Sequence, residues 1–202
     1  PERYEAVCRD FRNGFVRARN LRYKQKAIFL DRDGTINKYV GFLRNIHDFE
    51  LIDGVAEAIR EINNNGYLAI VVTNQPVIAR GEVTQEQLCR IHDKMETLLG
   101  LSGAYLDGIY VCPHHPHKGY AGEIPELKCD CGCRKPKPGL LLRAAKDFNI
   151  DLSASWMIGD SESDILAGIA AGCSTGLIGN ENFGQNKTGS SLSELIPQII
   201  KA

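Results

Sequence analysis

Short, uniformly apolar runs alternate with longer mixed segments along most of this chain. Residues 27–30 and 68–72 are apolar at every position, as in strands that are buried on both faces of a sheet. Three later runs, at residues 108–112, 155–159 and 175–178, indicate further strands. Because these strands alternate with helix-length segments, the sequence predicts an α/β fold with a doubly wound parallel sheet.

The segments between the strands carry signals for helix starts and ends. Asp53 is expected to cap a helix that ends at residues 65–66, Asn-Gly. Thr84 and Gln87 have the spacing of a capping box at the start of another helix. The remaining helices are predicted at residues 140–148, 161–171 and 191–201. Residues 180–190 are polar and rich in glycine, so they are expected to form a mobile loop.

Composition and charge narrow the function classes. The 202 residues are 43% hydrophobic and 24% charged, which is ordinary for a globular protein. The net charge of −1 gives no field that would attract nucleic acid or an anionic membrane. No apolar stretch is long enough to span a bilayer, and no secretory signal pattern is present. We therefore expect a cytoplasmic protein without nucleic-acid or membrane partners.

Residues 1–25 differ from the remainder, residues 26–202. The first part places one apolar face on a predicted helix, made of Tyr4, Val7, Cys8 and Phe11. A basic connector follows, with Arg12, Arg17, Arg19, Arg22 and Lys24. This basic connector is interpreted either as a patch that binds nucleic acid or as a solvated linker. The linker is favoured, because aromatic residues do not interleave with the charges.

Polar residues follow three of the predicted strands at the point where each strand ends. They are Asp31 and Asp33, then Thr73 and Asn74, then Asp160 and Asp164. Each pair alone is explained as well by a turn or a cap, and the basic pair Arg134–Lys135 by a solvated surface. In a parallel sheet, however, these strand ends share one edge, so the side chains are expected to converge. Oxygen ligands of this kind suit Mg²⁺, which commonly accompanies phosphate.

The cysteines indicate a second metal. Seven are present, and four of them fall between residues 112 and 133. A Cys-x-His pair and a later Cys-x-Cys pair supply enough soft ligands for tetrahedral Zn²⁺. The sequence alone does not select four ligands among seven candidates: Cys112, His114, His115, His117, Cys129, Cys131 and Cys133. His47 and His92 lie away from these motifs and are expected to be surface or hydrogen-bonded histidines.

The ordered strand-end motifs resemble those of the haloacid dehalogenase (HAD) superfamily: Asp-x-Asp-x-Thr, Thr/Ser, Lys and Gly-Asp-x-x-x-Asp. This resemblance covers about residues 26–200. It implies a Rossmann-like HAD fold without a cap domain, and an aspartyl-phosphate phosphatase in which Asp31 is the nucleophile and Asp33 the general acid and base. Thr73 and Lys135 would hold the phosphoryl oxygens. Mg²⁺ would be bound by Asp31, the Asp33 carbonyl and Asp160, with Asp164 supporting them.

The cysteine loop, with Cys-Pro-His-His-Pro and Cys-x-Cys-Arg-Lys-Pro-x-Pro-Gly, resembles the heptose 1,7-bisphosphate phosphatases of this superfamily. Aligning on Arg134 and Lys135 implies a structural zinc site in a loop that pins both residues over the phosphate. Its ligands would be Cys112, His114, Cys131 and Cys133, and a register that includes Cys129 is the alternative. The implied substrate is a heptose bisphosphate that loses its C7 phosphate. Its contacts would be Arg32, Gly41, Phe42, Asn74, Gln75, Arg134 and Ser161.

Several positions depart from that family pattern, and they leave rival functions open. Residues 39–42 are less polar than expected, Ser161 stands where Lys is common, and Pro76 stands where Ser is common. The anomer of the sugar is therefore left open. The rivals are a histidinol-phosphate phosphatase, a non-catalytic zinc module that binds protein or nucleic acid, and a phosphotransferase with an acceptor other than water.

The opening Pro-Glu-Arg-Tyr resembles the C-terminal tail of sugar-phosphate nucleotidyltransferases. The resemblance covers only about a dozen residues. It implies a nucleotidyltransferase domain fused upstream of the phosphatase. A vector remnant or a natural terminus is the alternative.

Overall fold

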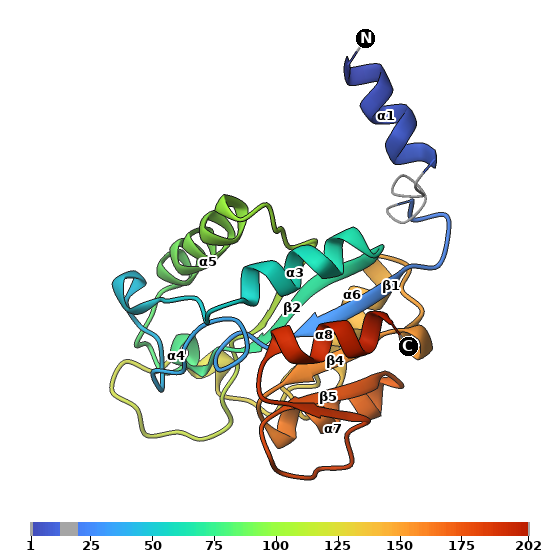
Figure 1. Cartoon of the computed structure of the whole chain (residues 1–202). Coiled ribbons are helices and arrows are strands. Elements are labelled where there is room, and N and C mark those ends of the chain that lie inside the picture. The colour runs from blue at the N-terminus through green and yellow to red at the C-terminus, as the bar shows by residue number, and fades with distance from the viewer. Residues whose placement is uncertain (1, 13–19, 202) are drawn as a thin grey trace.

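A six-stranded sheet lies at the centre of the fold (Figure 1). The computed structural model describes residues 2–12 and 20–201. All of the strand pairings are parallel, in the order β3-β2-β1-β4-β5-β6. The strands are β1 (Lys26–Leu30), β2 (Tyr67–Asn74), β3 (Gly108–Cys112), β4 (Trp156–Gly159), β5 (Ser174–Ile178) and β6 (Lys187–Gly189). The doubly wound α/β fold predicted from the sequence is confirmed.

Alternate residues of the central strand β1 face two different layers of helices. Ile28 and Leu30 pack into the core beneath one layer, and Ala27 and Phe29 pack into the core beneath the other. All four side chains are fully buried, which explains why residues 27–30 include no polar position. The first layer contains α3 (Val55–Asn64), α5 (Gln85–Leu101) and α8 (Leu192–Ile200). The second contains α6 (Gly139–Asp147) and α7 (Glu162–Ala171).

The strand order fixes where a site can form. The chain runs outward from β1 through β2 to β3, then returns to β4 on the other side of β1 and continues outward to β6. The order therefore reverses between β1 and β4, which are hydrogen-bonded neighbours. In an open parallel sheet a crevice forms beyond the carboxyl ends of the two strands at such a reversal. Asp31 and Asp160 directly follow these two strands.

Helix capping agrees with the sequence at one predicted start and differs at another. Thr84 Oγ1 accepts a hydrogen bond from Gln87 N, and Gln87 Oε1 accepts one from Thr84 N, as predicted. At α3 the N-cap is Gly54 instead of Asp53, and no side chain caps the helix. Gly54 has φ +78°, a left-handed conformation that glycine adopts without strain. Asp53 therefore lies one residue before the cap position.

Two short elements were not predicted. Strand β6 occupies part of residues 180–190, where a mobile loop was expected, and it pairs with β5. Its three residues are too few for a strand period to be recognised. Helix α4 (Pro76–Ala79) follows β2 immediately and places Pro76 in its first turn. Three 3₁₀ turns complete the fold: η1 (Ile46–Asp48), η2 (Pro125–Leu127) and η3 (Leu152–Ala154).

The N-terminal segment forms the predicted helix, α1 (Glu2–Arg12), which Figure 1 draws apart from the sheet. Tyr4 and Phe11 are exposed, and Cys8 is partly buried. Arg17 and Arg19 of the predicted basic connector lie outside the described residues, as does the Val7 side chain. Among the described helices, none is both long and apolar enough to cross a membrane. The division at residue 25, the upstream domain and the cytoplasmic location stay predictions.

The core under α3 provides a stability prediction. Ile59 is fully buried against the sheet, whereas Glu57 on the same helix is exposed. We expect Ile59→Ala to lower the free energy of unfolding by about 2–5 kcal/mol, because it removes buried methylene groups and leaves a cavity. Glu57→Ala is the matched control and should change it by less than about 0.5 kcal/mol. Urea denaturation followed by circular dichroism measures both. Similar values for the two variants would contradict the assigned core.

Candidate functional site

Three carboxylates gather at the reversal point of the sheet. One oxygen atom each from Asp31, Asp160 and Asp164 lies within 4.8 Å of the others. Asp31 follows β1, Asp160 follows β4, and Asp164 lies in the first turn of α7. Gly34 makes this approach feasible. It has φ +80°, and a Cβ atom there would lie 1.9 Å from Asp160 Oδ2, so only glycine fits.

A buried ammonium group neutralises part of this charge. Lys135 Nζ lies 2.7 Å from Asp31 Oδ1 and 2.6 Å from Asp164 Oδ1, and it also donates to the Val72 carbonyl. Burial opposes the charged ammonium, but Asp164 and Asp31 raise the pKa of Lys135 above its ordinary value. If all three carboxylates are ionised, they and one ammonium leave an excess of two negative charges. The site is therefore electrostatically suited to a divalent cation.

The pKa values of two of these carboxyl groups are raised. Burial raises the pKa of Asp31 from 3.8 to about 7, although Lys135 lowers it and Asp164 raises it further. Burial, followed by the charge of Asp164, raises the pKa of Asp160 to about 6. Each group resists ionisation because water is excluded and like charges are near. The donor set consists of oxygen atoms, as Mg²⁺ prefers, so the residues fit that ion.

Asp164 has a second set of contacts that ties it to its own helix. Its Oδ2 accepts hydrogen bonds from Ser161 N and Ser161 Oγ, at 3.1 and 2.6 Å. The side chain is fully buried, and its other oxygen faces Lys135. A Cβ atom at Gly159 would lie 2.2 Å from Asp164 Oδ2, so this arrangement also requires glycine. These contacts favour Asp164 as a support for Lys135 over a partner of the helix dipole alone.

Asp33 has a separate set of partners and does not belong to the carboxylate group. Arg32 Nη2 donates to both carboxylate oxygens, at 2.9 and 2.7 Å. Asn37 Nδ2 and Gln75 Nε2 donate as well, at 3.1 and 2.9 Å. The orientation of Asp33 is thus fixed by donors from its own loop and from the end of β2.

Arg32 lies beneath the pocket surface. We expected it to contact substrate, but its side chain is fully buried and does not line the pocket. Its Nη1 lies 3.3 Å from His92 Nε2, and because arginine only donates, that nitrogen must accept. Burial, and next the charge of Arg32, lowers the pKa of His92 to about 4, consistent with a neutral ring. His92 is therefore a hydrogen-bonded histidine, as expected.

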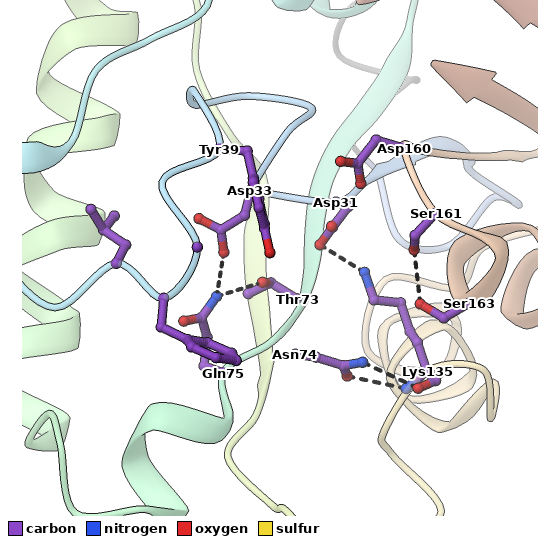
Figure 2. A pocket seen from close by; sticks show the side chains of 13 residues that line it. Asp31, Asp33, Tyr39, Thr73, Asn74, Gln75, Lys135, Asp160, Ser161 and Ser163 are labelled. Atoms are coloured by element: carbon purple, nitrogen blue, oxygen red, sulfur yellow. Dashed lines mark hydrogen bonds and ion pairs between the residues drawn. The ribbon is translucent and has the colours of Figure 1, made fainter. Parts of the chain in front are cut away.

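The end of β2 contributes polar groups to the same place. Thr73 Oγ1 accepts from Gln75 Nε2 at 2.8 Å. The Asn74 amide brackets the backbone of Lys135, since Nδ2 donates to its carbonyl and Oδ1 accepts from its N–H, both at 3.1 Å. Figure 2 shows these bonds. Asn74 was expected to bind substrate, yet its amide is already engaged in fixing the loop that carries Lys135.

A pocket of about 300 Å³ opens over these groups. Most of the predicted site residues line it: Asp31, Asp33, Gly41, Phe42, Thr73, Asn74, Gln75, Lys135, Asp160 and Ser161. Arg134 does not line it, and its Nη1 donates to the His114 carbonyl at 3.2 Å. Three further residues line the pocket: Tyr39, Leu43 and Ser163. The Oγ atoms of Ser161 and Ser163 are 2.9 Å apart (Figure 2). Because Ser163 lies in the first turn of the helix that follows Ser161, the sequence could have indicated this proximity.

The cysteine loop brings together four potential metal ligands: Cys112, His114, Cys131 and Cys133. The sulfur atoms of the three cysteines lie 3.3–3.5 Å apart, and His114 Nδ1 lies 3.3 Å from Cys133 Sγ. Three thiolates and one imidazole are a common ligand set of structural Zn²⁺ sites. Cys129 is exposed and lies outside this group, so the geometry favours the register without it.

The metal-binding loop leads directly along the chain to the pocket residue Lys135. Cys133 is separated from Lys135 only by Arg134, whose side chain holds the His114 carbonyl. Gly139 N donates to the Gly132 carbonyl at 3.1 Å, which closes the segment over the start of α6. A metal at the cysteines would therefore fix the backbone position of Lys135.

Comparisons with known proteins agree with this geometry. The sequence model of the HAD-hydrolase-like family matches residues 132–195. The D-glycero-β-D-manno-heptose-1,7-bisphosphate 7-phosphatase of Yersinia pestis is 47% identical over 74% of this chain and 77% of its own. That of Pasteurella multocida is 48% identical over 73% and 77%. The D,D-heptose 1,7-bisphosphate phosphatase from B. bronchiseptica, solved with magnesium and phosphate, is 30% identical, with TM-score 0.75 over 88% of this chain and 99% of that chain.

The raised pKa values predict how Mg²⁺ affects stability. As pH rises from about 4 to about 7, the metal-free folded chain binds more protons at Asp31 and Asp160 than the unfolded chain, so its stability falls. Mg²⁺ bound to the ionised carboxylates would relieve this loss. We expect MgCl₂ to raise Tm more at about pH 8 than at about pH 5.5. Thermal unfolding followed by calorimetry measures this difference, which Asp160→Asn should largely abolish. Equal increases at both pH values would contradict the site.

The cysteine group predicts metal content. Cys131→Ser should lower the bound zinc well below about one ion per chain, because a hydroxyl is a poor ligand for Zn²⁺. Cys129→Ser is the matched control, since it alters an exposed cysteine two residues away, and it should retain the ion. Elemental analysis of the purified variants measures the zinc. Loss of zinc in the Cys129 variant would restore the alternative register.

Proposed function

Because this chain belongs to the D-glycero-β-D-manno-heptose-1,7-bisphosphate 7-phosphatase family of HAD-like hydrolases, we propose that it hydrolyses the C7 phosphate of that β-configured sugar bisphosphate. The names of its relatives support the β anomer, which the sequence left open. The observation that carries the proposal is the pair of aspartates on one loop with different partners. Asp31 lies beside Lys135 and the other carboxylates, whereas Asp33 is held by Arg32, Asn37 and Gln75.

The first half-reaction transfers the phosphoryl group to the protein. A carboxylate oxygen of Asp31 forms a bond to phosphorus while the bond between phosphorus and the C7 oxygen breaks. Asp33 donates its proton to that leaving oxygen. Lys135, which is 2.7 Å from Asp31, and Thr73 donate to the phosphoryl oxygens as negative charge develops. The product of this step is an aspartyl phosphate and the sugar monophosphate.

The second half-reaction returns Asp31 to its free form. Asp33, now ionised, takes a proton from a water molecule as the water oxygen bonds to phosphorus. The bond between phosphorus and the Asp31 oxygen breaks, and inorganic phosphate leaves. Arg32 keeps the Asp33 carboxylate in the same orientation for both transfers, through its two short hydrogen bonds. One carboxylate therefore serves as acid and then as base.

Two metal ions complete the proposal. Asp31, Asp160 and the Asp33 carbonyl would hold Mg²⁺, which supplies positive charge between the carboxylate nucleophile and the phosphate dianion. Asp164 supports the site through Lys135. The four cysteine and histidine ligands would hold Zn²⁺ in a closed, structural site, since none of the tetrahedral positions remains for substrate.

Substitution of the nucleophile tests the reaction. Asp31→Asn should lower kcat by several orders of magnitude, because an amide cannot attack phosphorus as a carboxylate does. Fold and zinc content should be retained. Asp53→Asn, an exposed aspartate outside the pocket, is the matched control and should keep wild-type turnover. Phosphate release measures kcat. Turnover near wild type in the Asp31 variant would refute its assignment as the nucleophile.

A substrate panel tests the specificity. It contains both anomers of the heptose bisphosphate and histidinol phosphate, compared by kcat/KM. We expect the β anomer to rank first. A higher value for histidinol phosphate would replace the proposed substrate with the rival one, while leaving the same chemistry in place.

A further inference from the structure

Arg80 lies where three separate segments of the chain meet. It directly follows α4, is only 9% exposed, and does not line the pocket. Its guanidinium carbon lies 4.1 Å from the ring centroid of Phe42 and 4.6 Å from that of Tyr120. A planar cation in contact with two aromatic rings is stabilised by both of them. Phe42 belongs to the pocket rim, residues 39–44, and Tyr120 belongs to the metal-binding loop, residues 112–133.

His115 provides the third partner of Arg80. Arg80 Nη2 lies 3.1 Å from His115 Nε2, which must accept because arginine only donates. The other ring nitrogen, Nδ1, lies 3.1 Å from the His117 carbonyl and 3.3 Å from Lys128 Nζ. The ring is buried, and it directly follows His114, one of the four potential zinc ligands. The Arg80 side chain thus reaches to within one residue of the metal group.

Backbone contacts keep Arg80 in register with this loop. Ile124 N donates to the Ala79 carbonyl at 3.0 Å. A Cβ atom on Gly81 would lie 1.8 Å from the Gly122 carbonyl oxygen, so the two turns touch through glycine. The end of α4 and the metal-binding loop therefore pack as one unit. A shift of the loop would move Arg80 with it.

The pocket rim, by contrast, has few attachments of its own. In the described part of the chain, the backbone N–H groups of residues 39–44 donate to no other backbone group. Leu43 is buried and anchors the rim to the core on one side. Arg44 pairs with Glu82 in a partly exposed ion pair, which contributes little. Two cations face the Phe42 ring, and Arg80, at 4.1 Å from its centroid, is closer than Arg44, at 5.9 Å. The stacking on Arg80 therefore helps to set the position of the ring.

We propose that Arg80 is a positioning residue for substrate binding, which holds Phe42 in place and couples it to the metal-binding loop through His115 and Tyr120. The proposal rests on the phosphatase function above and specifies how the metal-binding loop influences the pocket. This route differs from the path through Lys135, because it acts on the rim and leaves the reacting groups unchanged. The expected consequence is a change in KM with little change in kcat.

Hydrogen exchange tests the coupling without using activity. In Arg80→Gln, the Lys38 amide at the base of the rim and the His115 and Ile124 amides of the metal-binding loop, which all donate to backbone carbonyls, should exchange faster than in the wild type, while the amides of β1 stay protected. Arg90→Gln removes an exposed arginine that pairs with Glu86, and it should change neither segment. Arg80→Lys keeps the charge and loses the planar stacking, so it should give an intermediate effect. Unchanged exchange in either segment of Arg80→Gln would overturn the proposal.

Kinetics test whether Arg80 acts through Phe42. Arg80→Gln and Phe42→Leu should each raise KM for the heptose bisphosphate by about two- to fivefold, the equivalent of one cation–π contact with a partly exposed ring. The double variant should show no further increase, since both changes remove the same contact. Multiplying effects, or a loss in kcat at constant KM, would overturn the proposal. A wild type that does not hydrolyse the sugar refutes the proposed function instead, and the exchange experiment then decides the role of Arg80.

Discussion

The ion pair of Lys135 with Asp31 and Asp164 is the interaction on which the site depends. All three side chains are largely or wholly shielded from water, where an unpaired charge would be very costly. The three residues belong to different crossovers of the sheet: the turn after β1, the loop before α6, and the start of α7. One ammonium group therefore fixes three segments relative to each other. The Asn74 amide extends this arrangement to β2, because it brackets the backbone of the same lysine.

Two different cations also resolve the repulsion between the neighbouring aspartates of the first motif. Lys135 faces Asp31, and Arg32 faces Asp33, so each carboxylate has its own positive partner. Because Asp33 interacts with a fixed guanidinium and two amides, it is oriented independently of the carboxylates that suit Mg²⁺. This separation gives two chemically identical side chains, two residues apart, different tasks in the proposed reaction.

Much of this arrangement could be predicted from the sequence, because its signals are local. The uniform apolar run before Asp31 indicated a buried strand, and the Cys-x-His and Cys-x-Cys spacings indicated a metal site. The missing parts depend on direction and long-range contact. Arg32 lies between two site residues, yet its guanidinium contacts Asp33 and His92 and does not line the pocket. The stacking of Arg80 joins segments distant in sequence, and no periodic pattern encodes it. Strand β6 is too short to have a period.

The pairing of β1 with β4 has a consequence for folding during synthesis on the ribosome. Leu30 lies opposite Ile158, and Asp31 N donates to the Ile158 carbonyl, so Asp31 is held by a strand made much later in synthesis. A nascent chain that has exposed β1, β2, β3 and α6 contains the first aspartates and the four potential zinc ligands, yet it lacks Asp160 and Asp164. It is therefore unable to assemble the carboxylate group. The carboxylate group is complete only after β4 and the start of α7 have been made and β4 has paired with β1.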